Sequence, residues 1–444
     1  MNYHYARLVG LTLCALSAPL LAEPLPIKIS VDLSSVAPSA HLQDESQPKR
    51  DLPSATQIDA ALDQHLFVLN AHSQLQIEQA NQRRREAGEY EFTVRGGSFR
   101  NYMYNPNGAE NLRDWEVALE RPFRLPNKLM LDSDIGAEGV TRGENALGDA
   151  RHEAARSLLK LWFNWQREKA QQLQWQQQVT LLKQQSAITE KRIQAGDAPR
   201  MELNQINANV ALANISLQQA HLRSQLAANE LTRQFSALKL GDNIPVLEPQ
   251  AVPQNLDYWQ QIIRQHNHEL ALAAAEERYQ QKLAERASAE RLPDPTLGFR
   301  YANQMSGNQK ISGVYFSIPL SYSTRAANAD AAHQAAQIAS DRNLAVQKRL
   351  DADIIATYTQ VENNYQIWQQ AREAGVALRQ NAELIARAYR LGESSLGDTL
   401  VARRQALEAS LAEILAQLDA NESRYRLLLD AHQLWADPDH HEEK

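Results

Sequence analysis

The chain has 444 residues, a formal net charge of −7 and only 7% aromatic residues. Acidic and basic residues are interspersed, so the sequence contains no long basic block of the kind that binds nucleic acid. Long segments rich in Ala, Gln, Leu, Glu and Arg predict extended helices and coiled coil, and they argue against the single thick core of an ordinary globular enzyme.

The N-terminal residues differ from the rest of the chain. An apolar run from Leu8 to Ala22 follows basic residues and gives way to polar sequence, which predicts a secretory signal peptide at residues 1–22. Residues 23–53 are predicted to form an extended N-terminal lead. Cys14, the only cysteine, lies within the apolar run, so we expect the exported chain to have neither disulfides nor a thiolate metal site. No other stretch approaches about 18 consecutive apolar residues, the length that a transmembrane helix needs.

The remaining sequence uses one order of elements twice, which predicts two structural repeats of helix, hairpin, long helix and helix. The first repeat covers residues 54–240, the second covers residues 256–435, and residues 241–255 link them. Pro122 and Pro319 are 197 residues apart, and Gly196 and Gly392 are 196 residues apart. Alternating apolar and polar side chains predict the strands, at about 89–104, 113–122, 296–303 and 311–320.

Each repeat contains one uninterrupted helix that is unusually long. The two are predicted from Lys128 to about Ala195 and from Arg325 to about Leu391, and each would measure about 100 Å. Apolar residues step by four and three between Ile354 and Trp368, a spacing typical of left-handed coiled coil. The fold class is therefore mainly α with a small β part.

The four predicted strands have the length of tilted β-structure that crosses a bilayer. An open four-stranded sheet cannot lie in lipid, because the backbone groups at its edges would have no hydrogen-bond partners. Several chains would therefore have to associate to close a barrel. The alternative is a pair of soluble hairpins packed on the helices. The aromatic residues of the strands and the predicted export favour the membrane interpretation.

Two stretches of the sequence resemble the TolC-like outer membrane factor family (the outer membrane efflux proteins). The stretch from Asn267 to Asn303 resembles the family's helix that leads through Leu-Pro-Asp-Pro into a strand. The stretch from Ala388 to Ala412 resembles the family's Tyr-x-x-Gly-x5-Asp-x-Leu turn. The matching residues of this turn are Tyr389, Gly392, Asp398 and Leu400. The resemblance covers about residues 54–435.

The resemblance implies a homotrimer, with an α-helical barrel in the periplasm continued by a 12-stranded β-barrel in the lipid of the outer membrane. Its implied function is a passive channel-tunnel, the exit duct of a tripartite efflux pump for drugs or metal ions. An inner-membrane pump would supply the substrate through a periplasmic adaptor protein, and no nucleic acid is involved. Two alternatives stay open: the duct of a type I protein secretion system, and an exported periplasmic coiled-coil adaptor or structural protein.

The two helix breaks contain the candidate functional residues. Gly196 and Gly392 are suited to end a helix in the left-handed conformation, and Pro199 suits a tight restart. Glu202 and Asp398 each lie six residues after their glycine, in the first turn of the returning helix. The helix dipole favours a carboxylate there, and this capping role alone explains the residue type.

A gate is the alternative role for these acids. Symmetry would repeat Asp398 in every chain and form an acidic ring that favours cations at a pore entrance, and the resemblance places a gate acid at this position. Some family members have a second acid three residues later, where this sequence has Val401, so a double acidic ring is not expected.

The sequence predicts no catalytic, cofactor or metal site, and the protein is therefore not expected to be an enzyme. The stretch that begins at His152 has Arg156 where a zinc-protease helix needs its second histidine. No phosphate-binding loop or nucleophile elbow is present. Residues 436–444 contain His440 and His441 among acids, a composition that can bind a divalent metal weakly, but they are predicted to form a disordered tail.

Overall fold

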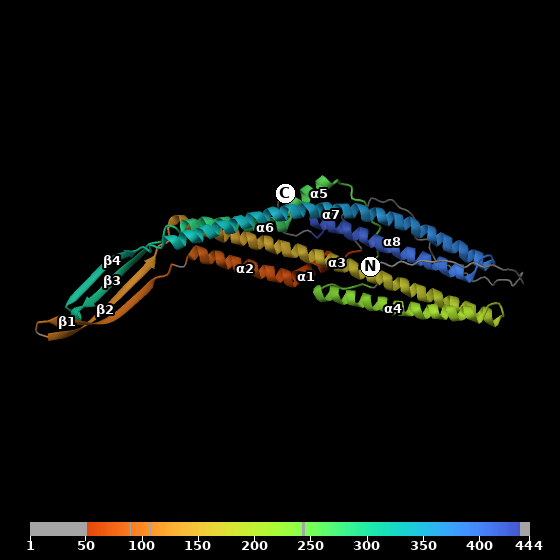
Figure 1. Ribbon diagram of the computed structural model, residues 1–444, viewed down its shortest axis with the longest axis horizontal. Helices are drawn as coiled ribbons and strands as arrows, with labels where there is room; N and C mark the ends of the chain where they lie inside the picture. Colours follow the sequence, from red (N-terminus) through yellow and green to blue (C-terminus); the bar gives the residue numbers. More distant parts are fainter. Residues whose placement is uncertain (1–50, 89, 107, 242–244, 436–444) are drawn as a thin grey trace, which may run out of the picture.

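The computed structural model describes residues 51–88, 90–106, 108–241 and 245–435. The predicted signal peptide, nearly all of the predicted lead and the predicted tail with His440 and His441 lie outside the described residues. The described chain forms a long rod of helices with one β-sheet at its end (Figure 1). Its elements are α1 (Ala55–Asp63), α2 (Leu66–Ala87), β1 (Thr93–Asn105), β2 (Gly108–Pro122), α3 (Pro126–Gln194), α4 (Arg200–Gln234), α5 (Leu256–His266), α6 (His268–Ala289), β3 (Thr296–Gln304), β4 (Gln309–Ser317), α7 (Tyr322–Arg390) and α8 (Leu396–Asp430), with a short 3-10 turn at Met305–Gly307.

Apart from α1 and α5, the helices recur with equal lengths in the two halves of the chain. The long helices α3 and α7 have 69 residues each, the returning helices α4 and α8 have 35 each, and α2 and α6 have 22 each. A helix of 69 residues is about 100 Å long. The prediction of a mainly helical protein with a small antiparallel sheet is confirmed.

The helices that precede the hairpins are shorter than the sequence suggests. The repeat pattern predicts one continuous helix before each hairpin, but in the first repeat it is interrupted between α1 and α2 at His65. The backbone of His65 is extended (φ −70°, ψ 133°), which interrupts the helix, and its imidazole stacks on Phe235 at 5.0 Å. In the second half the same kind of break occurs at Asn267, whose side chain accepts a hydrogen bond from the backbone N–H of Leu270 and caps α6.

The hydrophobic core lies where α1, α3, α8 and the end of α4 meet. Trp162, Phe163 and Trp165 of α3 pack there with Phe235 and Tyr425. Further towards the helix breaks the packing clusters are small and contain mostly alanine and aliphatic side chains, such as the cluster of Ala382, Ala402 and Ala406. The rod is therefore anchored at its middle by aromatic residues and held more lightly at its far end.

The four strands form one antiparallel sheet in the order β1-β2-β3-β4. Two strand boundaries differ from the prediction. Residues 89–92 precede β1, which begins at Thr93, and the predicted loop after residue 104 is largely paired because β2 begins at Gly108. Asn105 pairs with Gly108, so a tight turn joins β1 and β2. The residues beside this turn are polar, and an alternation of apolar and polar residues therefore does not reveal the pairing. The second hairpin occupies Thr296–Gln304 and Gln309–Ser317, close to its predicted position.

The helices lie side by side in a fixed order. Towards the helix breaks, α4 contacts α3, α3 contacts α8, and α8 contacts α7 (Figure 1). Towards the sheet, the order is α2, α3, α6 and α7. The contacts of α3 with α6 and α8 join the two halves, and α7 lies at one edge of the rod along its whole length, opposite α2 and α4. No helix within the described ranges is both long and apolar enough to cross a membrane.

A network of ion pairs joins the sheet to the rod. Lys128 of α3 is fully buried, and its Nζ lies 3.0 Å from Asp294 Oδ1 and 3.3 Å from Glu290 Oε2. The hydroxyl of Tyr90 donates to Asp294 Oδ2 at 2.7 Å, and the backbone N–H of Leu125 donates to Oδ1 at 3.1 Å. Burial opposes ionisation of Asp294, but these bonds hold its pKa below the ordinary value. The segments that enter and leave the first hairpin thus meet the segment that enters the second at one carboxylate.

Replacing Asp294 with asparagine is expected to lower the free energy of unfolding by about 3 kcal/mol, because Lys128 then keeps a buried charge with one partner fewer. The double variant Lys128→Met with Asp294→Asn is expected to recover part of this loss. Thermal unfolding followed by circular dichroism measures both effects. Asp330→Asn is the matched control, because Asp330 pairs with Arg291 at an exposed site. Equal losses in the single and double variants would contradict this account.

Candidate functional site

The two helix breaks have the same backbone geometry. Gly196 and Gly392 have φ angles of +77° and +80°, in the left-handed region that favours glycine. Each break contains the pair of hydrogen bonds of a Schellman motif. In the first, Asp197 N–H donates to Arg192 O at 2.8 Å and Gly196 N–H to Ile193 O at 3.0 Å. In the second, the corresponding donors are Glu393, at 2.9 Å, and Gly392, at 3.1 Å.

The returning helices restart in different ways. Pro199 is the N-cap of α4, and it makes no side-chain cap bond. Ser395 is the N-cap of α8 and forms a capping box with Asp398. The Ser395 hydroxyl accepts from the Asp398 backbone N–H at 3.1 Å, and the Ser395 backbone N–H donates to Asp398 Oδ2 at 3.2 Å. Side-chain hydrogen bonds therefore cap the start of α8, whereas α4 starts after Pro199 without a side-chain cap.

The two predicted acids have different surroundings. Asp398 is exposed, and its hydrogen bonds with the side chain and backbone of Ser395 hold its pKa below the ordinary value of 3.8. The cap predicted for Asp398 is thus present in the structure. Glu202 occupies the third position of α4, and its Oε2 atom is buried without a hydrogen-bond partner. Arg192 is the nearby cation, and the negative charge of Glu202 helps to keep its guanidinium charged.

Arg192 joins the two breaks and was not among the predicted site residues. Its guanidinium donates to the Tyr389 hydroxyl at 2.7 Å, to Asp197 Oδ2 at 2.9 Å and to the Asp197 backbone oxygen at 3.0 Å. Leu400 adds an apolar contact, because it packs against the cluster of Val179, Leu182 and Ala213 on α3 and α4. The predicted residues of the two breaks therefore form one connected end of the rod, and the repeat spacing of 197 between Arg192 and Tyr389 was the one available signal.

One face of the sheet is apolar and open to the surroundings. The register places Val94, Leu119, Phe299 and Val314 in one row across all four strands. All four side chains are exposed, and Val94 and Val314 are each 70% exposed. Neighbouring rows on the same face add further exposed side chains, namely Trp115, Val117, Leu297 and Phe316. No described helix covers this face.

The opposite face of the sheet carries charged and polar side chains. Arg95 pairs with Glu120 across β1 and β2 at 2.6 Å, and Arg300 of β3 pairs with Glu116. The Tyr315 hydroxyl donates to Glu120 at 2.6 Å. The sheet thus has one exposed apolar face and one ion-paired face. The wall of a transmembrane barrel has the same division, whereas a soluble sheet packs its apolar face on a core.

Helix α4 has an apolar stripe on the side that faces away from α3. Ile206, Ala213, Ala220 and Ala227 recur every seven residues on its buried side. On its other side, residues spaced by four and three are all exposed, namely Met201, Gln205, Ala208, Leu212, Ile215, Gln219, Leu222 and Leu226. This spacing is that of a coiled-coil seam, and the seam has no partner within the described chain.

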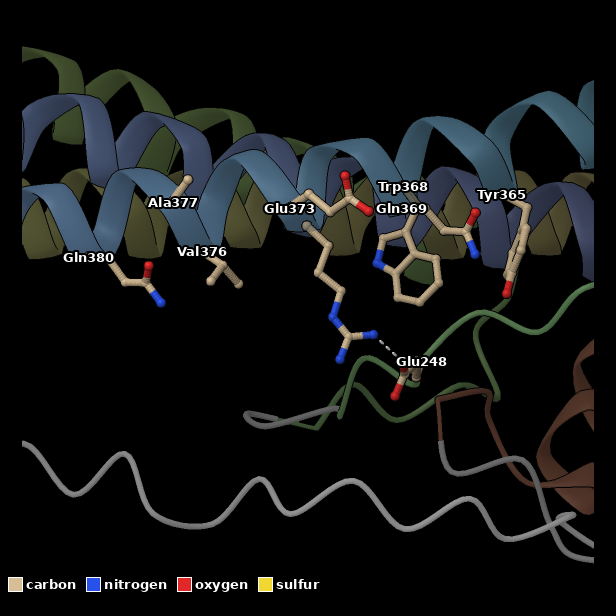
Figure 2. Close-up of a pocket in the computed structure, with 9 residues that line it drawn as sticks. Glu248, Tyr365, Trp368, Gln369, Glu373, Val376, Ala377 and Gln380 are labelled. Carbon is tan, nitrogen blue, oxygen red and sulfur yellow. Dashed lines mark hydrogen bonds and ion pairs between the residues drawn. The ribbon is translucent and has the colours of Figure 1, made fainter.

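Helix α7, at the other edge of the rod, borders a groove. A groove of about 590 Å³ runs along it and is bounded on one side by Glu248 of the inter-repeat segment (Figure 2). Arg372 pairs with Glu248, and its guanidinium carbon lies 5.6 Å from the centre of the Trp368 ring. The remaining lining residues lie on one side of α7, namely Tyr365, Gln369, Glu373, Val376, Ala377 and Gln380.

The histidines near the middle of the rod form no metal centre. In the part of the chain that the structure describes, no group of three or more His, Cys, Asp or Glu side chains is arranged to hold a metal ion. His152 binds Asp430 instead, with its Nε2 atom 3.2 Å from Oδ1, and Arg156 donates to the same carboxylate at 2.8 Å. The stretch that resembles part of a zinc-protease motif is therefore a helix face within an ion-pair network.

Several solved structures are similar to this chain. VceC, an outer membrane protein from Vibrio cholerae, is 16% identical with a TM-score of 0.70, over 86% of this chain and 96% of that one. The CmeC outer membrane channel of Campylobacter jejuni is 15% identical with a TM-score of 0.68, over 85% of each chain. The open-state MtrE outer membrane channel of Neisseria gonorrhoeae is 17% identical with a TM-score of 0.58, over 88% of this chain and 90% of that one.

These similarities define the class of fold. No protein-family model matches the sequence, and no curated protein matches it either. The chain has the fold of these outer membrane channels, which is the fold that the resemblance to the TolC-like outer membrane factors implied.

Replacing Tyr389 with phenylalanine is expected to loosen both helix breaks together, because the lost hydrogen bond joins them and contributes about 1 kcal/mol. Hydrogen exchange of residues 193–198 and 389–394 measures the effect. Tyr365→Phe, on the same helix but away from the breaks, is the control. Faster exchange at only one of the two breaks would show that Tyr389 does not connect them.

Proposed function

We propose that the protein is a trimeric channel-tunnel of the outer membrane, with its sheet in the lipid and its helices in the periplasm, and that it serves as the passive exit duct of a tripartite efflux pump. The single observation that carries this proposal is the sheet, which has one exposed apolar face, one ion-paired face and two unpaired edges. The similarity in fold to outer membrane channels supports it independently.

The sheet requires other chains for a physical reason. In lipid, every backbone N–H and C=O group must find a partner inside the protein, because no water is available there. The outer edges of β1 and β4 have no partner strand among the described residues. Three copies would provide 12 strands, enough for a closed barrel, and would leave no edge. The apolar face would then contact lipid, and the face with Arg95 and Glu120 would line the lumen.

The helices close a ring in the same way. The seam of α4 and the groove of α7 lie at opposite edges of one chain, so α4 of one copy would pack along α7 of the next. Their levels agree, since Ile215 lies 15 residues after the start of α4 and Val376 lies 14 residues before the end of α7. An interface between two different surfaces closes when it is repeated by rotation, and three copies complete the ring.

The connected helix breaks are placed at the periplasmic end of this tunnel, farthest from the sheet. Arg192 and Tyr389 would hold the two returning hairpins of each chain together and keep the entrance narrow. Asp398 would add a ring of carboxylates that favours cations in addition to its capping role. An inner-membrane pump, through a periplasmic adaptor protein, would deliver the drug or metal ion.

Other functions receive less support. A duct for type I protein secretion would use the same tunnel, since the pump selects the cargo. A periplasmic adaptor or structural rod would have no use for a sheet with an exposed apolar face. An enzyme would need a reactive constellation, and the described residues that were candidates form ion pairs within helices.

The proposal is tested by purifying the protein in detergent and inserting it into a planar lipid bilayer. We expect a trimer by native mass spectrometry and stepwise conductance with one dominant step size. A monomer recovered from the soluble periplasm, with no conductance after reconstitution, would rule the channel out and favour the rod.

Cysteine crosslinking tests the helical ring. Ile215→Cys combined with Val376→Cys is expected to produce disulfide-linked dimers and trimers under mild oxidation, because the two positions lie at one level on facing edges of neighbouring copies. Ala374→Cys is the matched control for Val376→Cys, since it is exposed on the same helix but lies outside the groove. Equal crosslinking of both pairs would contradict the proposed order of helices.

The two roles of Asp398 are separated by two variants. Ser395→Ala breaks the capping box and leaves the carboxylate in place, whereas Asp398→Ala removes both. We expect Asp398→Ala alone to weaken block of the channel by trivalent cations by about tenfold or more, which single-channel recordings measure. If trivalent cations block the channels of the two variants equally well, Asp398 acts as a helix cap only.

A further inference from the structure

The two faces of the sheet differ in the sign of their charges as well as in polarity. The register places all four acids of the strands on the ion-paired face, namely Glu110, Asp114, Glu116 and Glu120. The apolar face has no acid on any of the four strands, but it has four cations, namely Arg100, Arg113, Arg121 and Lys310. The charge of the apolar face is therefore entirely positive.

Two of these cations lie directly opposite each other. Arg100 of β1 and Arg113 of β2 are Cα partners in the register, which places their Cβ atoms about 5 Å apart on the same face. Both side chains are exposed, and within the described ranges neither guanidinium forms an ion pair. Like charges at directly opposite positions destabilise a sheet. These two residues are called the arginine pair, and a negative group from outside the strands would relieve their repulsion.

The arginine pair lies at the end of the apolar surface that is farther from the helices. The next row towards the helices contains Trp115, and the rows after it contain Val117 and Leu119. The ring of Trp115 lies 5.6 Å from that of Tyr301. Tryptophan and tyrosine are enriched where a membrane protein passes from lipid into water. The arginine pair is one row beyond these aromatic residues, at the depth where lipid headgroups would lie.

Arg121 lies at the other end of the apolar surface. It is eight residues from Arg113 along β2, which is about 27 Å along the strand or about 21 Å of height at a tilt of about 40°. The apolar band of outer-membrane barrels is about 25 Å tall. Arg121 has partners in its own chain, because its Nε donates to the Tyr90 backbone oxygen at 3.1 Å and its guanidinium carbon lies 4.9 Å from the centre of the Phe92 ring. The arginine pair is therefore the end of the band that suits an external ligand.

A phosphate group has the chemistry that the arginine pair would recognise. The guanidinium group matches phosphate oxygens with two parallel hydrogen bonds, and two guanidinium groups at this spacing can hold one phosphate between them. The adjoining surface is apolar, since Trp115 and Val117 are each 43% exposed. A lipid with a phosphorylated headgroup satisfies both parts of this surface, whereas a free phosphate ion satisfies only the first.

We propose that the arginine pair binds the phosphorylated headgroup of a membrane lipid, whose acyl chains lie along Val117 and Leu119. Lys310, one row nearer the helices on β4, adds a third positive charge to the same face. The position of this lipid in the leaflet farther from the helices rests on the proposed channel, whereas its binding to the arginine pair does not. In the proposed trimer β4 would adjoin β1 of the next copy, so the lipid would contact two copies.

Native mass spectrometry of the full-length, delipidated protein in detergent tests the site, with lipid A that carries two phosphates as the probe. Arg100→Gln combined with Arg113→Gln is expected to weaken binding by about tenfold or more, because the contacts to phosphate are charge-assisted. Arg342→Gln combined with Lys348→Gln is the matched control, since it removes two exposed cations from α7, outside the sheet. Equal affinity of the unmodified protein and the arginine double variant would overturn the proposal.

Two further probes distinguish a lipid from a free anion. Lipid A without phosphates is expected to bind about tenfold more weakly or less, and inorganic phosphate in large excess is not expected to displace the phosphorylated lipid. Equal binding of the dephosphorylated lipid would show that only its acyl chains are recognised. Displacement by inorganic phosphate would show that the arginine pair holds a free anion. Either result would overturn the proposal.

A single charge reversal separates lipid binding from a structural role of the arginine pair. Arg113→Glu places an acid opposite Arg100, so the Tm in lipid-free detergent is expected to rise by about 1–2 °C. The same variant is expected to bind the phosphorylated lipid about tenfold more weakly or less, because the acid repels phosphate. A lower Tm without lipid would show that Arg113 stabilises the sheet itself, and would overturn the proposal.

The planar-bilayer recordings separate this inference from the proposed function. A protein that binds phosphorylated lipid through the arginine pair but never conducts would retain the lipid site and lose the channel. A conducting trimer whose lipid affinity is unchanged in the arginine double variant would retain the channel and lose the lipid site.

Discussion

The outer edges of β1 and β4 have no partner strand in the part of the chain that the structure describes, and this constrains the rest of the architecture. In the proposed channel the apolar face of the sheet contacts lipid, and in lipid an open edge leaves a row of backbone groups without partners. The cost of each such group is several kcal/mol, so in the proposed channel the β1 edge of one copy would pair with the β4 edge of the next. A rotation that closes the sheet also places the helical rods around one axis. The seam on α4 and the groove on α7 are where such rods would touch.

The contacts between the sheet and the helices set the orientation of the one relative to the other. Lys128, Asp294 and Tyr90 connect the segment that enters the second hairpin to the segments that enter and leave the first. Buried ion pairs of this kind contribute little net stability but define one geometry, because alternative packings would leave a charge unpaired. The aromatic core around Trp162 and Phe163 fixes the middle of the rod. The far end, with its alanine-rich packing, is held mainly by Arg192 and the two glycine turns.

The sequence predicted those parts of the molecule that depend on local patterns. Alternation placed Trp115, Val117 and Leu119 on one side of β2, and the register puts them in the rows of the apolar face. The glycines at both breaks were identified because only a few residues tolerate their backbone conformation. The early start of β2 was missed because Gly108 to Asn111 are polar or small, and pairing there depends on backbone register and not on hydrophobic alternation.

Long-range polar contacts were beyond this reasoning. Arg192 is one of several arginines near the ends of helices, and nothing local distinguishes the one that reaches Tyr389. The stacked rings of His152 and His432 belong to positions 280 residues apart, and this contact forms only when both repeats have folded against each other. Asp398 illustrates the intermediate case, since its position in the capping box follows from sequence whereas any effect on ions depends on symmetry.

The equal lengths of α4 and α8 have a consequence for any partner that approaches the far end of the rod. Because both returning helices have 35 residues, the two turns of a chain lie at the same height. Three copies would present six turns in a circle, nearly sixfold in outline. Their chemistry would alternate, since one turn is closed by Pro199 and the next by Ser395 with its acid. A partner that matches only the shape of this end could bind in six rotational positions. A partner that also matches its charges could bind in only three of them, so shape alone would not set its rotational position.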